Sequence, residues 1–178
     1  MPAKTPTTPA EVEIVRSFVN TIDVDEETDQ LTSPTGLEQW LKGVDLLPKG
    51  AKASGRDLKL ALRLRSALRD ELIDHHDGVI DPKVKATLEE VCCSLPLKAV
   101  CGPDGLAPSE GGVRGALAQV MAAATTSRIK GTWPRLKLCP ADDCLWAFYD
   151  VSRNRSKRWC SMEVCGNRSK VRAYRDRH

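Results

Sequence analysis

The spacing of four cysteines near the C-terminus constrains this chain more than any other feature. They form two pairs, each with four intervening residues, and fifteen residues separate the pairs. Two cysteines on either side of a tight turn supply one edge of a tetrahedron of thiolates, which is the geometry that zinc prefers. The sequence therefore predicts one structural zinc ion, held by Cys139, Cys144, Cys160 and Cys165. Because the protein supplies all four ligands, no coordination position stays open, and we expect no catalysis at the metal.

The remaining cysteines and the histidine pair do not carry a comparable pattern. Cys92, Cys93 and Cys101 lie in apolar contexts without paired spacing, so we expect small core residues. His75 and His76, with Asp74 and Asp77, form the other cluster of metal-ligand types, but adjacent histidines after a helix are typical of a polar helix end. No Gly-rich phosphate loop or nucleophile–base pairing is found, and we predict that the chain is not an enzyme.

The N-terminus and the hydropathy pattern indicate a cytoplasmic protein. No apolar run approaches the roughly 20 residues that span a bilayer, so we expect no membrane contact. Residues 1–9 lack the apolar core of a signal peptide and are predicted to be a disordered lead. In a reducing compartment paired cysteines favour a metal over disulfides.

Charge is distributed unevenly along the 178 residues. Residues 1–127 carry 14 basic and 19 acidic residues, a balance of −5, whereas residues 128–178 carry 13 and 5, a balance of +8. A zinc ion with four thiolates has a net charge of −2, which lowers that excess to about +6. A basic C-terminal region indicates an anionic partner, and the alternative is a solvated charged helix.

Apolar periodicity predicts a mainly helical domain over residues 10–130. Ser33-Pro34 and Asp81-Pro82 combine a capping side chain with proline at the first helical position, and Asp57 is expected to cap a helix from Leu58 to about Asp74. The other predicted helices cover residues 10–20 and 112–127. Gly102-Pro-Asp-Gly between two short apolar runs predicts one β-hairpin. Gly131-Thr-Trp-Pro ends the pattern.

The segment 135–178 is predicted to be a small treble-clef-like zinc finger. After the first cysteine pair we expect a strand over residues 145–150, a turn at 153–156, a returning strand at 157–160 and a helix after Cys165. About 40 residues are too few to fold around a core of their own. Zinc binding, on the order of 10–16 kcal/mol in finger peptides, would supply the missing stability.

These residues resemble two known families. The finger resembles the CGNR zinc finger, named for the tetrapeptide found here at Cys165 to Arg168; Leu145 stands where that family commonly has glycine. The match rests on residues 139–144, Trp146, Phe148, Asp150, Ser152, Asn154, 158–162 and 165–170. Residues 18–21, 31–34, 37, 40–41 and 62–69 are similar to the ABATE domain, which usually precedes a CGNR finger in bacterial proteins described as stress-induced transcription regulators.

The resemblance implies a DNA-binding regulator whose helical domain senses a ligand or a stress signal. Basic side chains would bind phosphates, and Arg or Asn would read base edges. The candidate nucleic-acid residues are Arg153, Arg155, Lys157, Arg158, Asn167, Arg168, Lys170, Arg172, Arg175 and Arg177. Arg168 projects near Cys165, so a structural role for it stays open. DNA is favoured over RNA because no exposed stacking aromatics are evident.

Two further expectations concern the helical domain. Polar or aromatic groups within the ABATE-like motifs are the candidate ligand-binding residues: Asn20, Thr21, Trp40 and Arg65. Self-association into a homo-oligomer is compatible with the sequence. The alternative function is a protein-interaction module, in which zinc is purely structural, the finger packs on the helical domain and nucleic acid is not bound.

Overall fold

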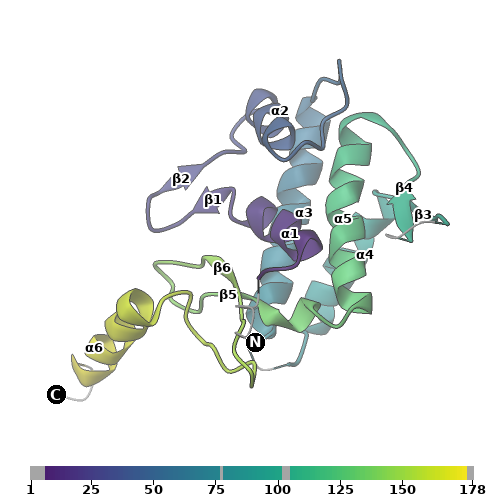
Figure 1. Ribbon diagram of the computed structural model, residues 1–178. Helices are drawn as coiled ribbons and strands as arrows, with labels where there is room; N and C mark the ends of the chain where they lie inside the picture. The colour runs from purple at the N-terminus through teal and green to yellow at the C-terminus, as the bar shows by residue number, and fades with distance from the viewer. Residues whose placement is uncertain (1–6, 77, 102–104, 176–178) are drawn as a thin grey trace.

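The longest helix, α3 (Gly55–Asp74), runs through the centre of the computed structural model, which describes residues 7–76, 78–101 and 105–175. Leu64, Leu68 and Leu72 recur along one side of α3 and are fully buried. Helix α1 (Ala10–Val19) packs against both α3 and α5 (Gly112–Ile129), as Figure 1 shows. These three helices supply most of one hydrophobic core, and the predicted mainly helical fold is confirmed.

The predicted capping devices are present at two helices. Ser33 accepts a hydrogen bond from the backbone N–H of Gly36 at 3.1 Å and begins α2 (Pro34–Gly43). Asp81 accepts one from the N–H of Lys83 at 2.8 Å and begins α4 (Pro82–Cys93). In both helices proline occupies a first-turn position that needs no hydrogen-bond donor. Both α2 and α4 pack on α3.

The start of α3 differs from the prediction by three residues. Ser54, not Asp57, is the N-cap, and the two side chains form a reciprocal capping box. The Ser54 hydroxyl accepts from the N–H of Asp57 at 3.3 Å, while the Asp57 carboxylate accepts from the N–H of Ser54 at 2.8 Å. Asp57 is therefore the third residue of the helix, where a carboxylate also interacts favourably with the helix dipole.

The described part of the chain contains three two-stranded antiparallel sheets. The first joins β1 (Ile22–Asp23) to β2 (Thr28–Asp29). The second, β3 (Leu97–Ala99) with β4 (Leu106–Pro108), is the predicted hairpin. The third joins β5 (Leu136–Leu138), which follows a short 3-10 turn (Trp133–Arg135), to β6 (Ala147–Tyr149), so that Leu138 faces Ala147 across the ladder.

The third sheet corrects the predicted hairpin of the finger. We expected residues 145–150 to pair with residues 157–160, but β6 pairs with β5, the segment before the first cysteine. Leu136 and Leu138 are buried in the same core as α1, α3 and α5, which gives β5 an apolar surface to pack on. Residues 157–160 form no strand, although Lys157 contacts Lys137 of β5 and Phe148 of β6.

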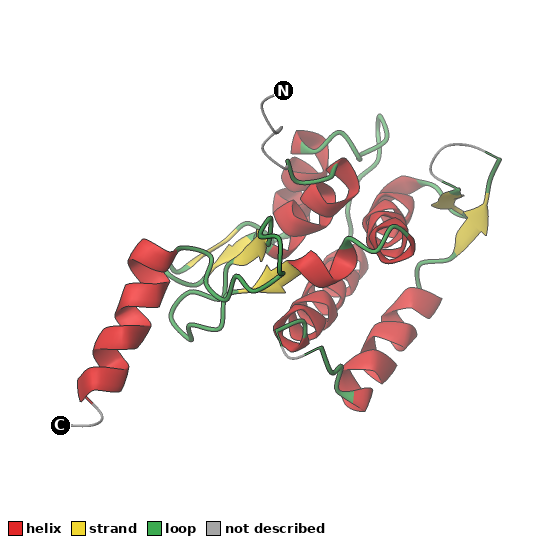
Figure 2. Ribbon diagram, turned by 60° about the horizontal axis from the view of Figure 1, so that its bottom comes forward, coloured by secondary structure: helices red, strands yellow, loops and turns green. Residues whose placement is uncertain are grey.

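The C-terminal helix stands apart from this body. Helix α6 (Asn167–Arg175) continues from a π-helical turn (Met162–Gly166) and has no buried residue. Figure 2 shows it on the far side of the small sheet from the helical core.

Other expectations at the periphery have mixed outcomes. Cys93 and Cys101 are exposed and only Cys92 is partly buried, so the prediction that all three are core residues was wrong. Val91 is the buried residue of α4, so the end of this helix leaves Cys93 exposed, and Cys101 lies beyond β3. Residues 1–6 of the predicted disordered lead, together with Asp77, lie outside the described residues.

Candidate metal centre and nucleic-acid interface

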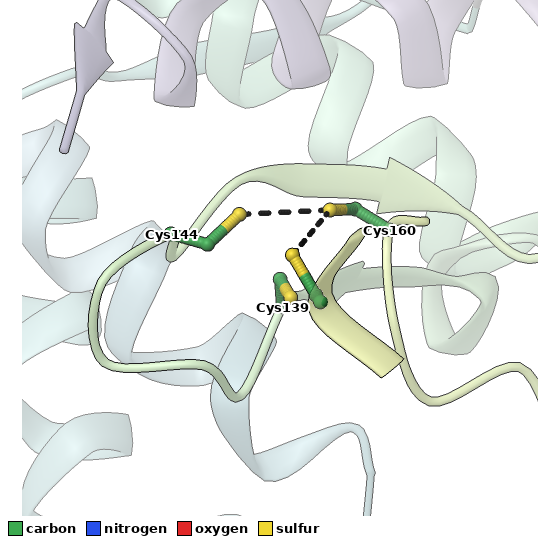
Figure 3. Close-up of side chains that lie close together, drawn as sticks. Cys139, Cys144 and Cys160 are labelled. Atoms are coloured by element: carbon green, nitrogen blue, oxygen red, sulfur yellow. Dashed lines mark hydrogen bonds between the residues drawn. The ribbon is translucent and has the colours of Figure 1, made fainter. Parts of the chain in front are cut away.

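The four predicted zinc ligands converge in space. Their sulfur atoms all lie within 4.8 Å of one another. Figure 3 shows the side chains of Cys139, Cys144 and Cys160 close together. The Sγ–Sγ distances are 3.5 Å from Cys144 to Cys160 and 3.6 Å from Cys160 to Cys165. A tetrahedron with zinc–sulfur bonds of about 2.3 Å has sulfur–sulfur edges of about 3.8 Å. The donor set and its spacing therefore fit one zinc ion, and the sulfurs are too far apart for disulfides.

Two local turns bring the ligands of each pair together. In the first, the N–H groups of Cys144 and Leu145 both donate to the carbonyl of Ala141, at 2.9 and 3.0 Å. Leu145 has a φ of +49°, the left-handed conformation in which a side chain is unfavourable. This conformation gives a physical reason for the glycine that the CGNR family commonly has at this position.

The second turn places Cys165 at the start of the C-terminal helical segment. The Ser161 hydroxyl accepts from the N–H of Val164 at 3.3 Å, and the Ser161 carbonyl accepts from the N–H of Gly166 at 3.1 Å. A Cβ atom on Gly166 would lie 2.5 Å from the sulfur of Met162 and 3.3 Å from the Trp159 ring. A side chain at this position would displace the Met162 thioether and crowd the Trp159 ring, which favours glycine after the last cysteine.

Burial and mutual proximity govern how the thiols ionise. Burial raises the pKa of Cys144 to about 11, and burial also raises the pKa of Cys160. Burial opposes ionisation of Cys139 as well, but N–H groups of Cys160 and Ala141 donate to its sulfur and leave its pKa lowered. A cation supplies the positive charge that a cluster of thiolates needs, so metal binding and loss of thiol protons are coupled.

A small apolar cluster surrounds the metal site. Phe148 and Ala141 are buried together with three of the cysteines, and Trp146 and Trp159 pack against them. This cluster is separate from the helical core. Four thiolates in such a setting supply structure and no open coordination position, so the site is structural.

The structure ties two of the candidate nucleic-acid residues into ion pairs. Arg168 donates to Asp143 at 3.0 Å and also contacts both carboxylate oxygens of Asp25, at 3.0 and 3.1 Å. Arg172 donates to the same oxygen of Asp143 at 2.7 Å. These contacts join the start of α6 to the first cysteine turn. They raise the pKa of the Arg168 guanidinium, chiefly through Asp25, and they lower the pKa of both carboxyls, chiefly through Arg168.

The other candidates lie at or near the surface. Asn167 donates to the carbonyl of Glu163 at 3.0 Å. Lys157 is half-buried, with its ammonium 5.2 Å from the centre of the Phe148 ring, and Arg158 lies over Trp159. The exposed candidates that form no ion pair with a described carboxylate are Arg153, Arg155, Arg158, Lys170 and Arg175. Arg177 lies outside the described residues.

A buried ion pair that the sequence analysis missed holds the basic loop in place. The Lys137 ammonium donates to Asp150 at 3.0 Å and to the carbonyl of Arg155 at 2.6 Å. Asp150 also accepts from the N–H groups of Ser152 and Lys157, both at 2.9 Å. Burial raises the pKa of Asp150, but hydrogen bonds from the Ser152 hydroxyl, at 2.6 Å, and from the Lys137 ammonium more than offset it and leave the pKa lowered. Alternation along β5 could have indicated that Lys137 points away from Leu136 and Leu138.

Side chains of the helical domain bind the backbone of the third sheet. The Asn20 amide donates to the carbonyl of Ala147 and accepts from its N–H. Arg69 donates to the carbonyls of Val19 and Leu145. His75 and His76 donate to the carbonyls of Leu136 and Leu138, each at 2.6 Å. The histidine pair thus docks the finger rather than ending a helix in solvent.

The candidate ligand-binding residues separate into two groups. Thr21 and Arg65 form a buried network in which Arg65 donates to the Thr21 hydroxyl at 3.0 Å and to Asp29 at 2.6 and 2.7 Å. Asn20 holds the sheet, as described above. Trp40 instead borders a cavity of about 380 Å³, lined also by Ser17, Gln30, Gly36, Gln39, Gly43 and Val44.

Comparison with known proteins places the chain in families. Residues 135–178 match the CGNR zinc finger, and residues 13–147 match the family described as "Putative stress-induced transcription regulator", ABATE. The two matches overlap over β5 and β6. A search of curated proteins returns no match. None of the described helices is both long and apolar enough to cross a membrane. Because the ABATE match covers more than half of its length and the CGNR match includes all four clustered cysteines, the chain belongs to the ABATE family and ends in a CGNR zinc finger.

Proposed function

We propose that the chain is a DNA-binding regulator in which the CGNR finger presents helix α6 to the duplex. The observation that carries the proposal is that α6 projects from the body with no buried residue and with four basic residues among its nine. An α-helix fits the major groove, and Lys and Arg neutralise phosphates. Families with regulatory and zinc-binding descriptions, rather than enzymatic ones, match the chain.

The contacts divide the basic residues by role. Arg168 and Arg172 are engaged by Asp143, so we assign them to orienting α6 on the metal site. Lys170 and Arg175 of α6, with Arg153, Arg155 and Arg158 of the loop, have exposed side chains for phosphate contacts. Asn167, at the start of α6, is the candidate for a base edge. Lys157 packs on Phe148, and Arg177 stays a candidate from the sequence alone.

Zinc is the support for this arrangement. A nine-residue helix is marginal by itself in water. Cys165 lies in the turn that leads directly into α6, and Arg168 and Arg172 fasten the first two turns of the helix to Asp143. Loss of the metal is expected to release α6 and with it the oriented charges.

A salt titration of duplex binding tests the proposal. The zinc-loaded protein should bind a short labelled duplex at low salt, with an affinity that falls linearly on a double-logarithmic salt plot. Lys170→Gln and Arg175→Gln should each reduce the slope by about 1, whereas Lys52→Gln on the opposite, helical part of the chain should not change it. No binding by the zinc-loaded protein at low salt would contradict the proposal.

We further propose that the helical domain senses a small ligand at the Trp40 cavity. Gln30, Gln39 and Ser17 supply polar groups around the Trp40 ring, as in many small-molecule sites. Gly36 allows a close approach at its wall, because a Cβ atom there would lie 2.2 Å from the carbonyl of Gln30. Thermal-shift screening of wild type against Gln39→Ala tests this. A stabilising compound that acts equally on both proteins binds elsewhere.

The second candidate function is a protein-interaction module. The docking of β5 and β6 on α1 and α3 favours it, because part of the finger is structurally committed to the helical domain. This function would be supported if the folded, zinc-containing protein binds no duplex DNA at any salt concentration.

A further inference from the structure

An acidic hairpin of the helical domain reaches the base of helix α6. Residues 22–29, which form β1, β2 and their connecting turn, include five acidic residues and no basic one. Asp23 shapes the turn, because its carboxylate accepts from the N–H groups of Asp25 and Glu26 at 3.1 and 3.2 Å. Asp29 anchors the other strand through Arg65. The acidic hairpin is thus fixed at its base and presents Asp25 at its tip.

The Asp25 carboxylate forms a bidentate ion pair with the Arg168 guanidinium. One carboxylate oxygen accepts from Nη1 at 3.0 Å and the other from Nη2 at 3.1 Å, across 143 positions of sequence. Asp143 holds Nη1 from the finger's own side at 3.0 Å. A hollow of about 250 Å³ separates the hairpin from the cysteine cluster, with Asp23, Glu26, Trp146 and Val164 on its walls. The tip therefore reaches Arg168 beside an open space and does not sit in a packed interface.

A carboxylate in this position resembles a nucleic-acid phosphate. The guanidinium fork binds carboxylates and phosphates with the same paired geometry. While Asp25 occupies both nitrogens, Arg168 has fewer donors for a phosphodiester, and the neighbouring carboxylates repel the phosphate backbone.

We propose that the acidic hairpin is an intramolecular competitor of nucleic-acid phosphate at Arg168. The proposal rests on the proposed DNA binding, and it adds that Arg168, which orients α6 through Asp143, also has donors for phosphate that Asp25 covers. Because the ion pair is exposed, its net strength is small, and the hairpin lowers DNA affinity by a few fold instead of blocking it.

The hairpin also connects the finger to the Trp40 cavity. Gln30 lines that cavity and directly follows β2, and its N–H donates to the carbonyl of Thr21 at 2.8 Å. A ligand in the cavity would touch the residue at the base of the hairpin. The acidic hairpin therefore links the Trp40 cavity of the helical domain to the side chain of Arg168.

Two charge-neutralising variants of the same hairpin test the competition. Asp25→Asn keeps the side-chain shape and removes the charge that faces Arg168. Glu27→Gln removes one charge from an exposed residue of the same turn that forms no ion pair with a described residue. With a fluorescein-labelled random-sequence duplex and zinc-loaded protein, Asp25→Asn should bind about two- to fivefold more tightly than wild type. For Glu27→Gln, the increase in duplex affinity over wild type should be only a small fraction of the increase for Asp25→Asn.

A second background distinguishes the Asp25–Arg168 contact from general repulsion between Asp25 and the DNA phosphates. In an Arg168→Gln background, checked for full zinc content, Asp25→Asn should no longer increase the affinity. Equal gains from Asp25→Asn and Glu27→Gln, or a gain that persists without Arg168, would overturn the proposal.

Hydrogen–deuterium exchange gives a readout without DNA. Amides of residues 22–29 should exchange faster in Asp25→Asn than in wild type or Glu27→Gln. If wild type does not bind the duplex at low salt, the proposed function fails, and a faster exchange still supports the Asp25–Arg168 contact. Equal exchange in all three proteins overturns the competitor proposal by itself.

Discussion

The side-chain amide of Asn20 pairs with both backbone groups of Ala147, as a neighbouring strand would. Its Oδ1 accepts from the N–H of Ala147 at 2.8 Å, and its Nδ2 donates to the carbonyl at 2.9 Å. Asn20 follows the last turn of α1, so this contact joins the end of the first helix to the first residue of β6. A two-stranded sheet is marginally stable alone, and the amide completes its edge.

Asn20→Ala is expected to destabilise the protein through this edge. The substitution leaves a buried N–H and a buried carbonyl of Ala147 without partners, and each such group costs about 1–3 kcal/mol. Urea unfolding should show a loss of roughly 2–4 kcal/mol with an unchanged m-value. Gln39→Ala, at an exposed position on α2, is the control and should stay within about 0.5 kcal/mol of wild type. Equal stabilities would mean that water replaces the amide.

Removal of one zinc ligand should disorder the finger while the helical core stays folded. Cys144→Ser removes one thiolate, and Cys93→Ser is the matched control because Cys93 is exposed and outside the cluster. We expect one zinc per chain by elemental analysis in wild type and in Cys93→Ser, and a large reduction in Cys144→Ser. The fluorescence of Trp146 and Trp159 should shift to the red, whereas far-UV circular dichroism should change little, because α6 has only nine residues. Loss of most helical signal would show that the core needs the metal.

Zinc affinity should depend steeply on pH. The pKa of Cys144 is raised to about 11 and that of Cys160 is raised as well, so both thiols are protonated near neutral pH without metal. Each must release its proton on binding, which makes the apparent dissociation constant fall by at least about 100-fold per pH unit between pH 6 and 8. Competition with a metallochromic chelator at three pH values measures the slope. A slope below one proton would show that the thiols are already ionised.

Lys137→Met should be among the most destabilising single substitutions. It leaves the Asp150 carboxylate buried without its cation, and breaking a buried ion pair typically costs about 3–5 kcal/mol. Chemical unfolding of Lys137→Met, with Lys170→Met as the exposed control, measures the difference. Lys137→Met combined with Asp150→Asn should recover part of the loss, because the unpaired charge is then absent.

The same pair predicts how acid acts on the protein. The pKa of Asp150 is lower folded than unfolded, so its contribution to stability is present above about pH 3.9 and is lost as the pH falls through the folded value. The free energy of unfolding should therefore fall in acid less steeply for the double variant than for wild type. Parallel pH profiles would assign the acid sensitivity to other carboxyls.

Local chemistry in the sequence was enough to predict the helices and the metal ligands. Ser33-Pro34 and Asp81-Pro82 fixed two helix starts because a cap and a proline act within one turn. The four cysteines could be paired from spacing because a tetrahedral site needs two short turns. The error at Asp57 has the same origin, since Ser54 and Asp57 are both capping residues and only the reciprocal bond decides between them.

Contacts between distant segments could not be predicted in this way. The pairing of β6 with β5 depends on the apolar surface that α1 and α3 offer to Leu136 and Leu138. Arg65 was a candidate ligand-binding residue in the sequence, yet its guanidinium binds Asp29 and Thr21 in the interior. Asp25 and Arg168 meet only because the acidic hairpin and the finger fold toward each other. A pattern of residues in a single sequence does not predict a contact between such distant positions.

The shared sheet also limits how such proteins can be rearranged during evolution or in the laboratory. Leu136, Leu138 and Ala147 contribute to the helical core, while Cys139 and Cys144 lie in the loop between the same two strands. A recombination point near residue 130 would separate this strand pair from the surface on which it packs. The helical domain left behind would then expose apolar side chains to solvent. A finger of this kind can be fused to another domain only if that domain provides equivalents of Asn20, Arg69 and the histidine pair. The helical domain and the finger are therefore expected to be inherited, and best engineered, as one piece.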